Sequence, residues 1–227
     1  MSNVTNIILE ASSGQRLESS INPESGLISL NFPSSPPEPL NPTDEWVARL
    51  VKNTIGSASN IVVDDIQYSA SRRKILLRLR MSPEYDSVTL IGGITPDLQG
   101  MMEAVPKSMN IEGVGLTIQN NRHENQAPLF FSRFFAPWMG INEDEVCGSL
   151  HAVLTPYWGN ILGKQSEVMM TRFVSSRTGD IYVKLERDKV LISGKTVVTL
   201  EGSFSCADLC NQSTEHNALR RLYPGKS

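Results

Sequence analysis

The sequence predicts an α+β protein built mainly from short antiparallel strands. Short apolar runs separated by turn residues recur along most of the chain, and connections this short join antiparallel strands. Two segments, 43–56 and 146–162, instead repeat apolar residues every three to four positions, as helices do. The second segment has so little polar surface that we expect a central helix buried on nearly every side.

Composition narrows the classes of function. With 227 residues and 40% hydrophobic content, the chain can bury a sizeable core. Its 21 Lys and Arg are scattered among 24 Asp and Glu, which argues against a nucleic-acid partner. No apolar stretch approaches the roughly 18 residues that span a bilayer, and the first residues do not resemble a signal peptide. We therefore expect a cytoplasmic protein with no membrane partner, in which Cys147, Cys206 and Cys210 are free thiols.

The first quarter of the chain is predicted to hold a hairpin, a further strand, a loop and a helix. Two apolar runs flank a Ser-Ser-Gly turn and a third follows, at residues 5–11, 16–22 and 27–32. Five prolines in 33–42 exclude a central strand there and mark a boundary. Thr43 should cap the helix that follows, and Gly56 should end it.

The rest of the chain alternates apolar runs with turn signals. Residues 61–69 and 74–81 should pair across a turn near Ser71, and 96–105 should form a short helix. We expect strands at 111–118 and 129–137 before the central helix. After that helix we expect an antiparallel meander of four runs, at 167–175, 180–187, 189–193 and 196–204.

The segment 140–158, GINEDEVCGSLHAVLTPYW, joins three acids to the start of the central helix. We expect this helix to begin between Asp144 and Gly148 and to kink before Pro156, which removes one intrahelical hydrogen bond. The first turn of a helix offers unpaired N–H groups and partial positive charge, so it attracts carboxylates. Gly148 would let an anionic ligand approach these amides, and the hydroxyl of Ser149 would add a donor.

The acids and the cysteine of this segment allow more than one interpretation. Asp144 or an acidic neighbour could accept a proton if burial raised the pKa of its carboxyl group. The position of Asp144 suits a helix cap equally well. Cys147 fits a small buried side chain better than a reactive thiolate, because nearby acids oppose the effect of the helix end. His151 fits a hydrogen-bonded core residue, and His123 fits a solvated loop residue.

The sequence gives no indication of a metal site. Cys206, Cys210 and His216 are too few ligands, at a spacing that zinc sites do not use. We therefore expect no bound metal.

Several segments resemble the phenazine-biosynthesis PhzF-like family. The longest, SRFFAPWMGINEDEVCGSLHAVLTPYW, is similar to the family pattern S-R-x-F-A-P-x-x-G-I-x-E-D-P-V-T-G-S-A-H, and SSRTGDIYVKL and ISGKTVVTLEG follow in the family order. The looser matches LEASSGQRL, LISLNFP and KILLRL extend the resemblance over nearly the whole chain up to Phe204. The resemblance implies a diaminopimelate-epimerase-like fold of two lobes, each an antiparallel barrel around a central helix. The active site would lie between the two helix N-termini.

The resemblance also implies a domain organisation. Residues 25–204 would form the second lobe, with 1–24 as remnant strands of the first lobe. Beyond residue 204 the resemblance ends and the hydrophobic pattern fades, which indicates a disordered C-terminal tail at 205–227. Family members carry in the first lobe an N-L-S-E segment, whose Glu is the principal acid/base, and a Gly-His motif. Neither string occurs in this chain. We therefore expect a truncated family member whose cleft has one wall.

For function, the resemblance implies isomerase chemistry by proton transfer on a small carboxylated substrate, without metal or organic cofactor. Asp144 falls on the Asp of the family's E-D-P segment. Gly148 and Ser149 fall on the Gly-Ser that would bind the substrate carboxylate. Three residues depart from the pattern, which has Pro, Thr and Ala at these positions: Glu145, Cys147 and Leu150. We expect weak or no activity from the chain alone.

Two other interpretations remain open. The chain could be a non-catalytic interaction or scaffold protein that uses the face once covered by the missing lobe. An exposed apolar face of that kind predicts a homodimer. Alternatively, Cys147 could form a Cys-dependent epimerase-like site that a second chain completes, since related epimerases of this fold place a catalytic Cys just before Gly-Ser.

Overall fold

The computed structural model describes part of the chain, namely residues 6–10, 14, 16–56, 61–82, 85–122, 127–200 and 202. They fall into two units, Met1–Lys195 and Thr196–Ser227, and every helix and strand given below lies in the first. No helix among these residues is long and apolar enough to cross a membrane. The predicted tail 205–227, with Cys206, Cys210 and His216, lies outside the described residues, as does His123.

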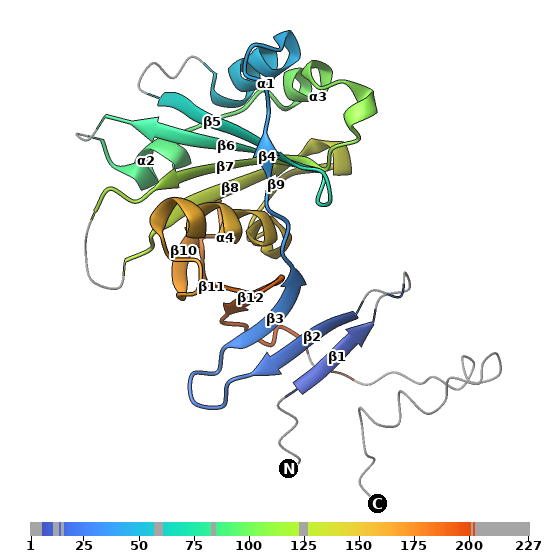
Figure 1. Ribbon diagram of the computed structural model, residues 1–227, viewed down its shortest axis with the longest axis vertical. Helices are drawn as coiled ribbons and strands as arrows, with labels where there is room; N and C mark the ends of the chain where they lie inside the picture. The colour runs from blue at the N-terminus through green and yellow to red at the C-terminus, as the bar shows by residue number, and fades with distance from the viewer. Residues whose placement is uncertain are drawn as a thin grey trace, which may run out of the picture. The chain divides into compact units, whose positions relative to one another are not determined.

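A twelve-stranded sheet forms the frame of the first unit (Figure 1). Its order is β1-β2-β3-β12-β11-β10-β8-β7-β6-β5-β4, and β9 pairs with β8 beside this path. The predicted hairpin is confirmed, because β1 and β2 pair antiparallel. The strand bounds are β1 Asn6–Glu10, β2 Arg16–Ile21, β3 Ile28–Pro33, β4 Glu38–Pro39, β5 Ile61–Ser69, β6 Lys74–Met81, β7 Gly113–Gln119, β8 Phe130–Ala136, β9 Ile141–Asp144, β10 Met169–Phe173, β11 Gly179–Glu186 and β12 Lys189–Gly194.

The described residues also form four α-helices and two 3₁₀ helices. Asp44 is the N-cap of the first helix, so the predicted Thr43 cap is wrong. The hydroxyl of Thr43 instead donates to Asn41 Oδ1 at 2.8 Å, in the turn before the helix. The helix bounds are α1 Glu45–Ile55, α2 Ser87–Gly92, α3 Leu98–Ala104, η1 Lys107–Met109, η2 Pro137–Met139 and α4 Gly148–Leu162. The sequence did not predict α2, because six residues give too little periodicity.

Two strand pairs are parallel, which corrects the prediction of a wholly antiparallel sheet. β6 pairs in parallel with β7, from Lys74 opposite Gly113 onward, and β8 pairs in parallel with β10. A parallel pair needs a crossover connection rather than a tight turn. The helices supply these crossovers, because α2 and α3 lie between β6 and β7, and α4 lies between β8 and β10.

Each face of the sheet carries its own hydrophobic cluster. On β6, Ile75 and Leu77 belong to the cluster that includes residues of α1, α2 and α3. Leu76, between them, belongs to the cluster built around α4. Because successive side chains of a strand point to opposite faces, β6 contributes to both hydrophobic clusters. In Figure 1, α1 and α3 lie on one side of strands β5 to β8, and α4 lies on the other.

α4 is the buried helix that the sequence predicts. Every residue from Leu150 to Thr155 is buried, and the helix begins at Gly148, within the predicted interval. Pro156 has no N–H to offer the carbonyl of Ala152. The backbone amide of Ser35, in the proline-rich loop, donates to that carbonyl at 3.0 Å. The helix therefore continues through Pro156 as far as Leu162 with the freed carbonyl hydrogen-bonded.

The predicted meander is confirmed in part. β10, β11 and β12 pair antiparallel in sequence, but residues 196–200, which were expected to begin a fourth strand, form none. A strand needs a neighbour to bond its backbone, and no pairing partner for 196–200 occurs within the described residues. No pairing in this part of the chain joins β1 to β4 either. The closed barrel and the remnant of another lobe therefore stay predictions, as do the domain bounds.

Candidate active site

The candidate site lies where β9 leads into α4. After β8, η2 and Gly140, whose φ is 75°, turn the chain so that β9 pairs back onto β8, with Asp144 opposite Phe134. Asp144 is the last residue of β9, and the N-cap of α4 is Cys147, three residues later. The interpretation of Asp144 as the helix cap is therefore wrong, because the residue ends a strand before the cap position.

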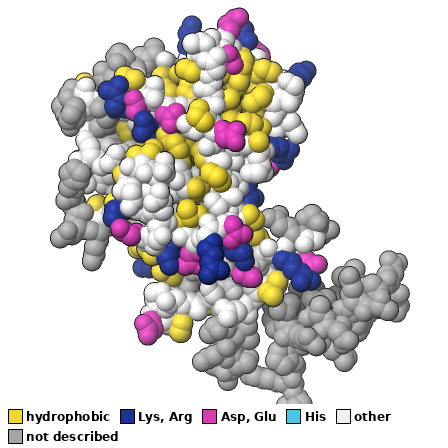
Figure 2. Space-filling model, in the orientation of Figure 1, with side chains coloured by type: hydrophobic (Ala, Val, Ile, Leu, Met, Phe, Trp, Pro, Cys, Tyr) yellow, Lys and Arg dark blue, Asp and Glu magenta, His cyan; other side chains and the backbone are white. Residues whose placement is uncertain are grey.

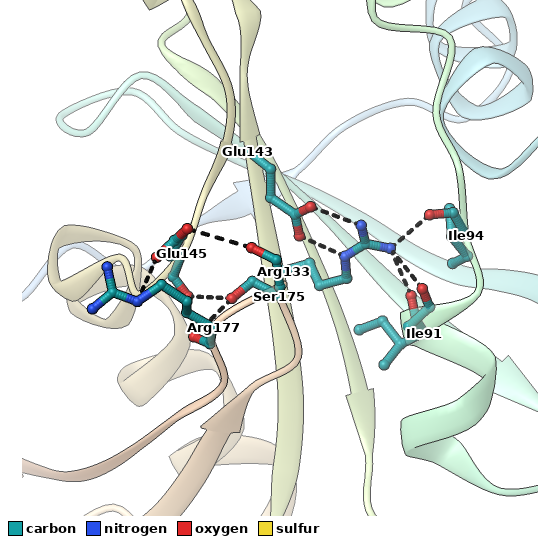
Figure 3. Close-up of polar contacts among 9 residues, drawn as sticks. Ile91, Ile94, Arg133, Glu143, Glu145, Ser175 and Arg177 are labelled. Atoms are coloured by element: carbon teal, nitrogen blue, oxygen red, sulfur yellow. Dashed lines mark hydrogen bonds and ion pairs between the residues drawn. The ribbon is translucent and has the colours of Figure 1, made fainter.

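Glu143, the residue before Asp144, is bound by a buried arginine (Figure 3). Arg133 on β8 is 8% exposed and donates from Nε to Glu143 Oε1 at 2.7 Å and from Nη2 to Oε2 at 2.9 Å. Its third nitrogen, Nη1, donates to the carbonyls of Ile91 at 2.9 Å and Ile94 at 2.6 Å. A two-bond contact between Arg and carboxylate fixes geometry as well as charge. Glu143 is thus engaged in structure rather than open to a ligand.

Glu145, the residue after Asp144, is held from the other side. Arg177 Nε lies 3.1 Å from Glu145 Oε2, and Ser176 Oγ donates to Oε1 at 3.3 Å. Ser175 Oγ donates to the backbone carbonyl of Glu145 at 2.7 Å, as Figure 3 shows. The side chain of Arg177 is 82% exposed, so solvent weakens its ion pair. The bond from Ser175 to the backbone is the firmer restraint on this part of the chain.

Asp144 differs from both neighbours, because it enters no ion pair with the described residues and acts instead on Cys147. Burial raises the pKa of the Cys147 thiol to about 11, and the charge of Asp144 and its hydrogen bond add to the rise. Hydrogen bonding with Ser149, whose Oγ lies 3.4 Å from Sγ, acts in the opposite direction. Cys147 is 5% exposed and stays protonated at neutral pH. The structure agrees with the interpretation of a small buried side chain.

The first turn of α4 leaves room for a ligand at Gly148. Gly148 and Ser149 are partly buried, and a Cβ built on Gly148 would meet no atom within 4 Å. Amides in the first turn have no intrahelical acceptor, and the helix end carries partial positive charge. The structure therefore brings Asp144, Gly148 and Ser149 together at one helix end that suits a carboxylate or another small anion.

His151 lies one turn into α4 and is completely buried. Its Nδ1 lies 3.1 Å from the carbonyl oxygen of Cys147, but its Nε2 has no hydrogen-bond partner among the described residues. The ring packs near those of Phe130 and Phe173. Burial lowers the pKa of His151 to about 4, although the bond to the Cys147 carbonyl opposes the shift. The predicted core histidine is confirmed, but only one of its two nitrogens is satisfied.

Sequence reasoning missed the residues that hold the two glutamates. Arg133 did give a signal, since it is the one charge in the apolar run LFFSRFFAP, and a charge in a buried strand needs a partner. Ser175 and Arg177 gave none, because their roles depend on how the connection between β10 and β11 meets the residue after β9. In the described part of the chain, no three His, Cys, Asp or Glu side chains are grouped so as to hold a metal.

Comparison with known proteins places this chain in a family. The family model of the phenazine biosynthesis-like proteins, PhzC-PhzF, matches residues 5–202. The human phenazine biosynthesis-like domain-containing protein is 35% identical over 184 residues, which are 80% of this chain and 60% of that protein. A Pseudomonas aeruginosa protein described as an uncharacterized isomerase is 27% identical over 186 residues, with 82% and 60% covered. The chain thus spans about 60% of the length of these curated relatives.

Solved structures agree with the sequence comparisons. A phenazine biosynthesis PhzC/PhzF protein from Clostridium difficile superposes with a TM-score of 0.67 at 27% identity, over 90% of this chain and 66% of that one. A PhzF-family protein from Enterococcus faecalis gives a TM-score of 0.68 at 25% identity, over 90% and 67%. These similarities confirm both the family and the mixed α+β fold that the sequence indicated. The chain belongs to the phenazine biosynthesis-like (PhzC-PhzF) protein family.

Proposed function

We propose that the N-terminus of α4 forms one half of a proton-transfer isomerase site for a small carboxylated substrate, working without metal or organic cofactor. Gly148 and Ser149 would bind the substrate carboxylate, and Asp144 would carry the proton. The observation that supports this assignment is the contrast among the three acids. Glu143 and Glu145 are each paired with an arginine, whereas Asp144 has no ion pair within the described residues. The isomerase description of the Pseudomonas relative supports the class of reaction.

The chemistry follows from the charges at this helix end. A substrate carboxylate held by the amides of Gly148 and Ser149 would place its neighbouring C–H bond near Asp144. The carboxylate of Asp144 would accept that proton, and the positive end of the helix would stabilise the negative charge that develops on the substrate. A second acid would then return a proton at another carbon. We assign this second acid to the separate lobe that the family resemblance implies.

The proposal also covers the organisation of the chain into lobes, its activity alone and its location in the cell. Residues 25–204 would form one lobe with a closed barrel around α4, and residues 1–24 would be strands of the other lobe. Because one wall of the cleft would come from elsewhere, the chain alone would be weakly active. We expect it to act in the cytoplasm.

Deuterium exchange tests this function. The purified chain is incubated in deuterated water with a panel of small carboxylic acids, and incorporation is followed by mass spectrometry. We expect slow incorporation that Asp144→Asn abolishes, whereas Ser149→Ala raises the substrate concentration required. Asp188→Asn, at an exposed position far along the sequence from the site, is the control that should not change the rate. Exchange that is insensitive to Asp144→Asn would contradict the proposal.

A second candidate function, as an interaction protein, is favoured by one face of strands β1, β2 and β3. Opposite residues of antiparallel strands share a face, which places Leu9 with Leu17 and Ile21 with Ile28. Leu9 is 49% exposed and Ile21 is 40% exposed, and none of the four belongs to either hydrophobic cluster of the described residues. A homodimer that buries this face would explain its apolar character. Light scattering after gel filtration would test it, with a concentration-dependent dimer expected and a monomer at all concentrations as the contrary result.

A further inference from the structure

Arg133 connects β8 and β9 with the end of α2, which lies 39 to 42 residues earlier in the sequence (Figure 3). Its side chain extends from β8, binds Glu143 of β9 with two nitrogens, and directs the third to carbonyls at the end of α2. The carbonyl acceptors belong to Ile91, Gly92 and Ile94, the second at 3.4 Å. A helix C-terminus carries partial negative charge, because its last carbonyls lack intrahelical donors, and it therefore binds a positively charged donor such as Arg133 favourably.

The burial of this contact distinguishes it from the surface ion pairs of the molecule. The Arg133 and Glu143 side chains are 9% and 24% exposed, and the guanidinium carbon of Arg133 lies 4.7 Å from the centre of the Phe135 ring. Arg172 and Asp180 make the same two-bond contact between β10 and β11, but they are 40% and 36% exposed. A buried pair whose third guanidinium nitrogen is also hydrogen-bonded holds its geometry far better than an exposed pair does.

β9 needs such a restraint, because its own ladder is short. Only two pairs, Asp144 with Phe134 and Ile141 with Ala136, join it to β8, and the register shifts between them. The side chain of Glu143 therefore adds a fixed point within the irregular part of the ladder. Side chains alternate along a strand, so fixing Glu143 toward Arg133 directs Asp144 to the other face, where it acts on Cys147.

We propose that Arg133 is a positioning residue, which holds β9 through Glu143 so that Asp144 faces the first turn of α4, and which joins that geometry to the end of α2. The proposal rests on the function proposed above for Asp144 and adds the residue on which its placement depends. The side-chain contacts of Arg133 given above are with Glu143, the Phe135 ring and the carbonyls at the end of α2. Its effect on the site passes through Glu143 and the backbone of β9.

Cys147 provides a measure of where Asp144 lies, without any substrate. Asp144 raises the pKa of the thiol, so moving the carboxylate away lowers that pKa and increases the fraction of reactive thiolate at a given pH. The reporter chain carries Cys206→Ser and Cys210→Ser, which leave Cys147 as its single thiol. The rate of its alkylation by iodoacetamide at pH 8 is then the observable.

Two variants break the contact, and one serves as the matched control. Glu143→Gln keeps the shape of the side chain but can accept only one of the two guanidinium bonds, and Arg133→Lys removes the paired geometry. We expect each to speed alkylation by about threefold or more, which corresponds to a fall of about half a unit in the thiol pKa. Arg172→Lys breaks the exposed contact and should leave the rate unchanged. If Arg133→Lys does not fold, as judged by circular dichroism, Glu143→Gln still decides the result.

A double-mutant cycle separates positioning from a general loosening of the fold. In an Asp144→Asn background, Glu143→Gln should give no further increase, because the group that it moves has lost its charge. An equal increase with and without Asp144 would overturn the proposal, and so would an unchanged rate in both single variants. The deuterium-exchange assay plays no part in this cycle. Its failure would refute the isomerase function and leave the positioning result standing.

Discussion

The backbone amide of Ser35 donates to the carbonyl oxygen of Ala152 across 3.0 Å and supplies the bond that Pro156 cannot make. Ser35 is 4% exposed, although it lies in a run of prolines that follows β3. Its own carbonyl accepts from Ser69 Oγ at 3.3 Å, so the residue ties α4 to the end of β5. The proline-rich loop is therefore part of the structure that supports the site helix.

This relationship predicts different effects from two substitutions of Ser35. Ser35→Ala keeps the amide and loses the contact of Oγ with Arg72 Nε at 3.2 Å, and it should lower the free energy of unfolding by about 0.5–1 kcal/mol. Ser35→Pro removes the donor, leaves the carbonyl of Ala152 unpaired, and should cost about 1–3 kcal/mol more. Urea denaturation measures both. Equal losses in the two variants would show that the amide bond contributes nothing.

Two glycines, Gly113 at the start of β7 and Gly148 at the start of α4, predict opposite responses to substitution by alanine. A Cβ on Gly113 would lie 2.4 Å from the backbone oxygen of Phe135, so Gly113→Ala must move the sheet and should cost about 3 kcal/mol. A Cβ on Gly148 would meet nothing, so Gly148→Ala should change stability by less than about 0.5 kcal/mol. The added methyl group would nevertheless crowd a ligand at the helix amides. Thermal unfolding and NMR titration with small carboxylates would detect a stable Gly148→Ala protein with weakened binding.

Local patterns in the sequence were enough to predict the strands and the site helix. β5, β6 and α4 each carry a complete period of apolar residues, and Gly56 ends α1 with a φ of 64°, which glycine adopts readily. The pairing of distant strands was beyond the sequence, because a parallel neighbour such as β10 beside β8 depends on where the intervening helix returns the chain. Strand order depends on packing between segments that lie far apart in the sequence, and not on the preference of each segment for helix or strand.

For the candidate site, too, the sequence predicted local features but not contacts between distant segments. Gly148, Ser149 and Asp144 could be named from their spacing, because a helix N-terminus is a local feature. The separate environments of Glu143 and Glu145 could not, since they depend on Arg133 from one strand and on Arg177 from a loop 32 residues after Glu145 in the chain. Only the folded arrangement shows which of the three consecutive acids forms no ion pair within the described residues.

The hydroxyl of Tyr157 predicts a measurable link between α4 and β5. It donates to Asp65 Oδ2 at 2.6 Å, and burial together with this bond raises the pKa of Tyr157 well above its usual range. Tyr157→Phe leaves that carboxylate with fewer donors, so we expect a loss of about 1.5 kcal/mol in unfolding free energy. Tyr182→Phe, on a partly buried tyrosine of β11, is the control and should cost less than about 0.5 kcal/mol. Similar losses in both variants would argue that the bond to Asp65 is energetically unimportant.

His151 predicts a dependence of stability on pH. Its folded-state pKa of about 4 lies below the usual value of 6.5, so the unfolded chain binds a proton at this residue more readily than the folded protein does. Its contribution to stability is complete above about pH 6.5, is lost as the pH falls toward 4, and changes no further below that. The shift of roughly 2.5 units corresponds to about 3 kcal/mol across the window.

Comparison with His151→Leu isolates this contribution from other titrating groups. The leucine cannot bind a proton, and it removes the buried Nε2 that has no partner among the described residues. Urea denaturation of both proteins between pH 7.5 and pH 4.5 should show the unmodified chain losing stability relative to the variant, with the difference growing by about 2 kcal/mol or more over that range. Carboxylates and the other two histidines are common to both chains, so their effects cancel. Parallel pH profiles would mean that His151 titrates alike in the folded and unfolded states, and that its burial between Phe130 and Phe173 does not hold the ring neutral.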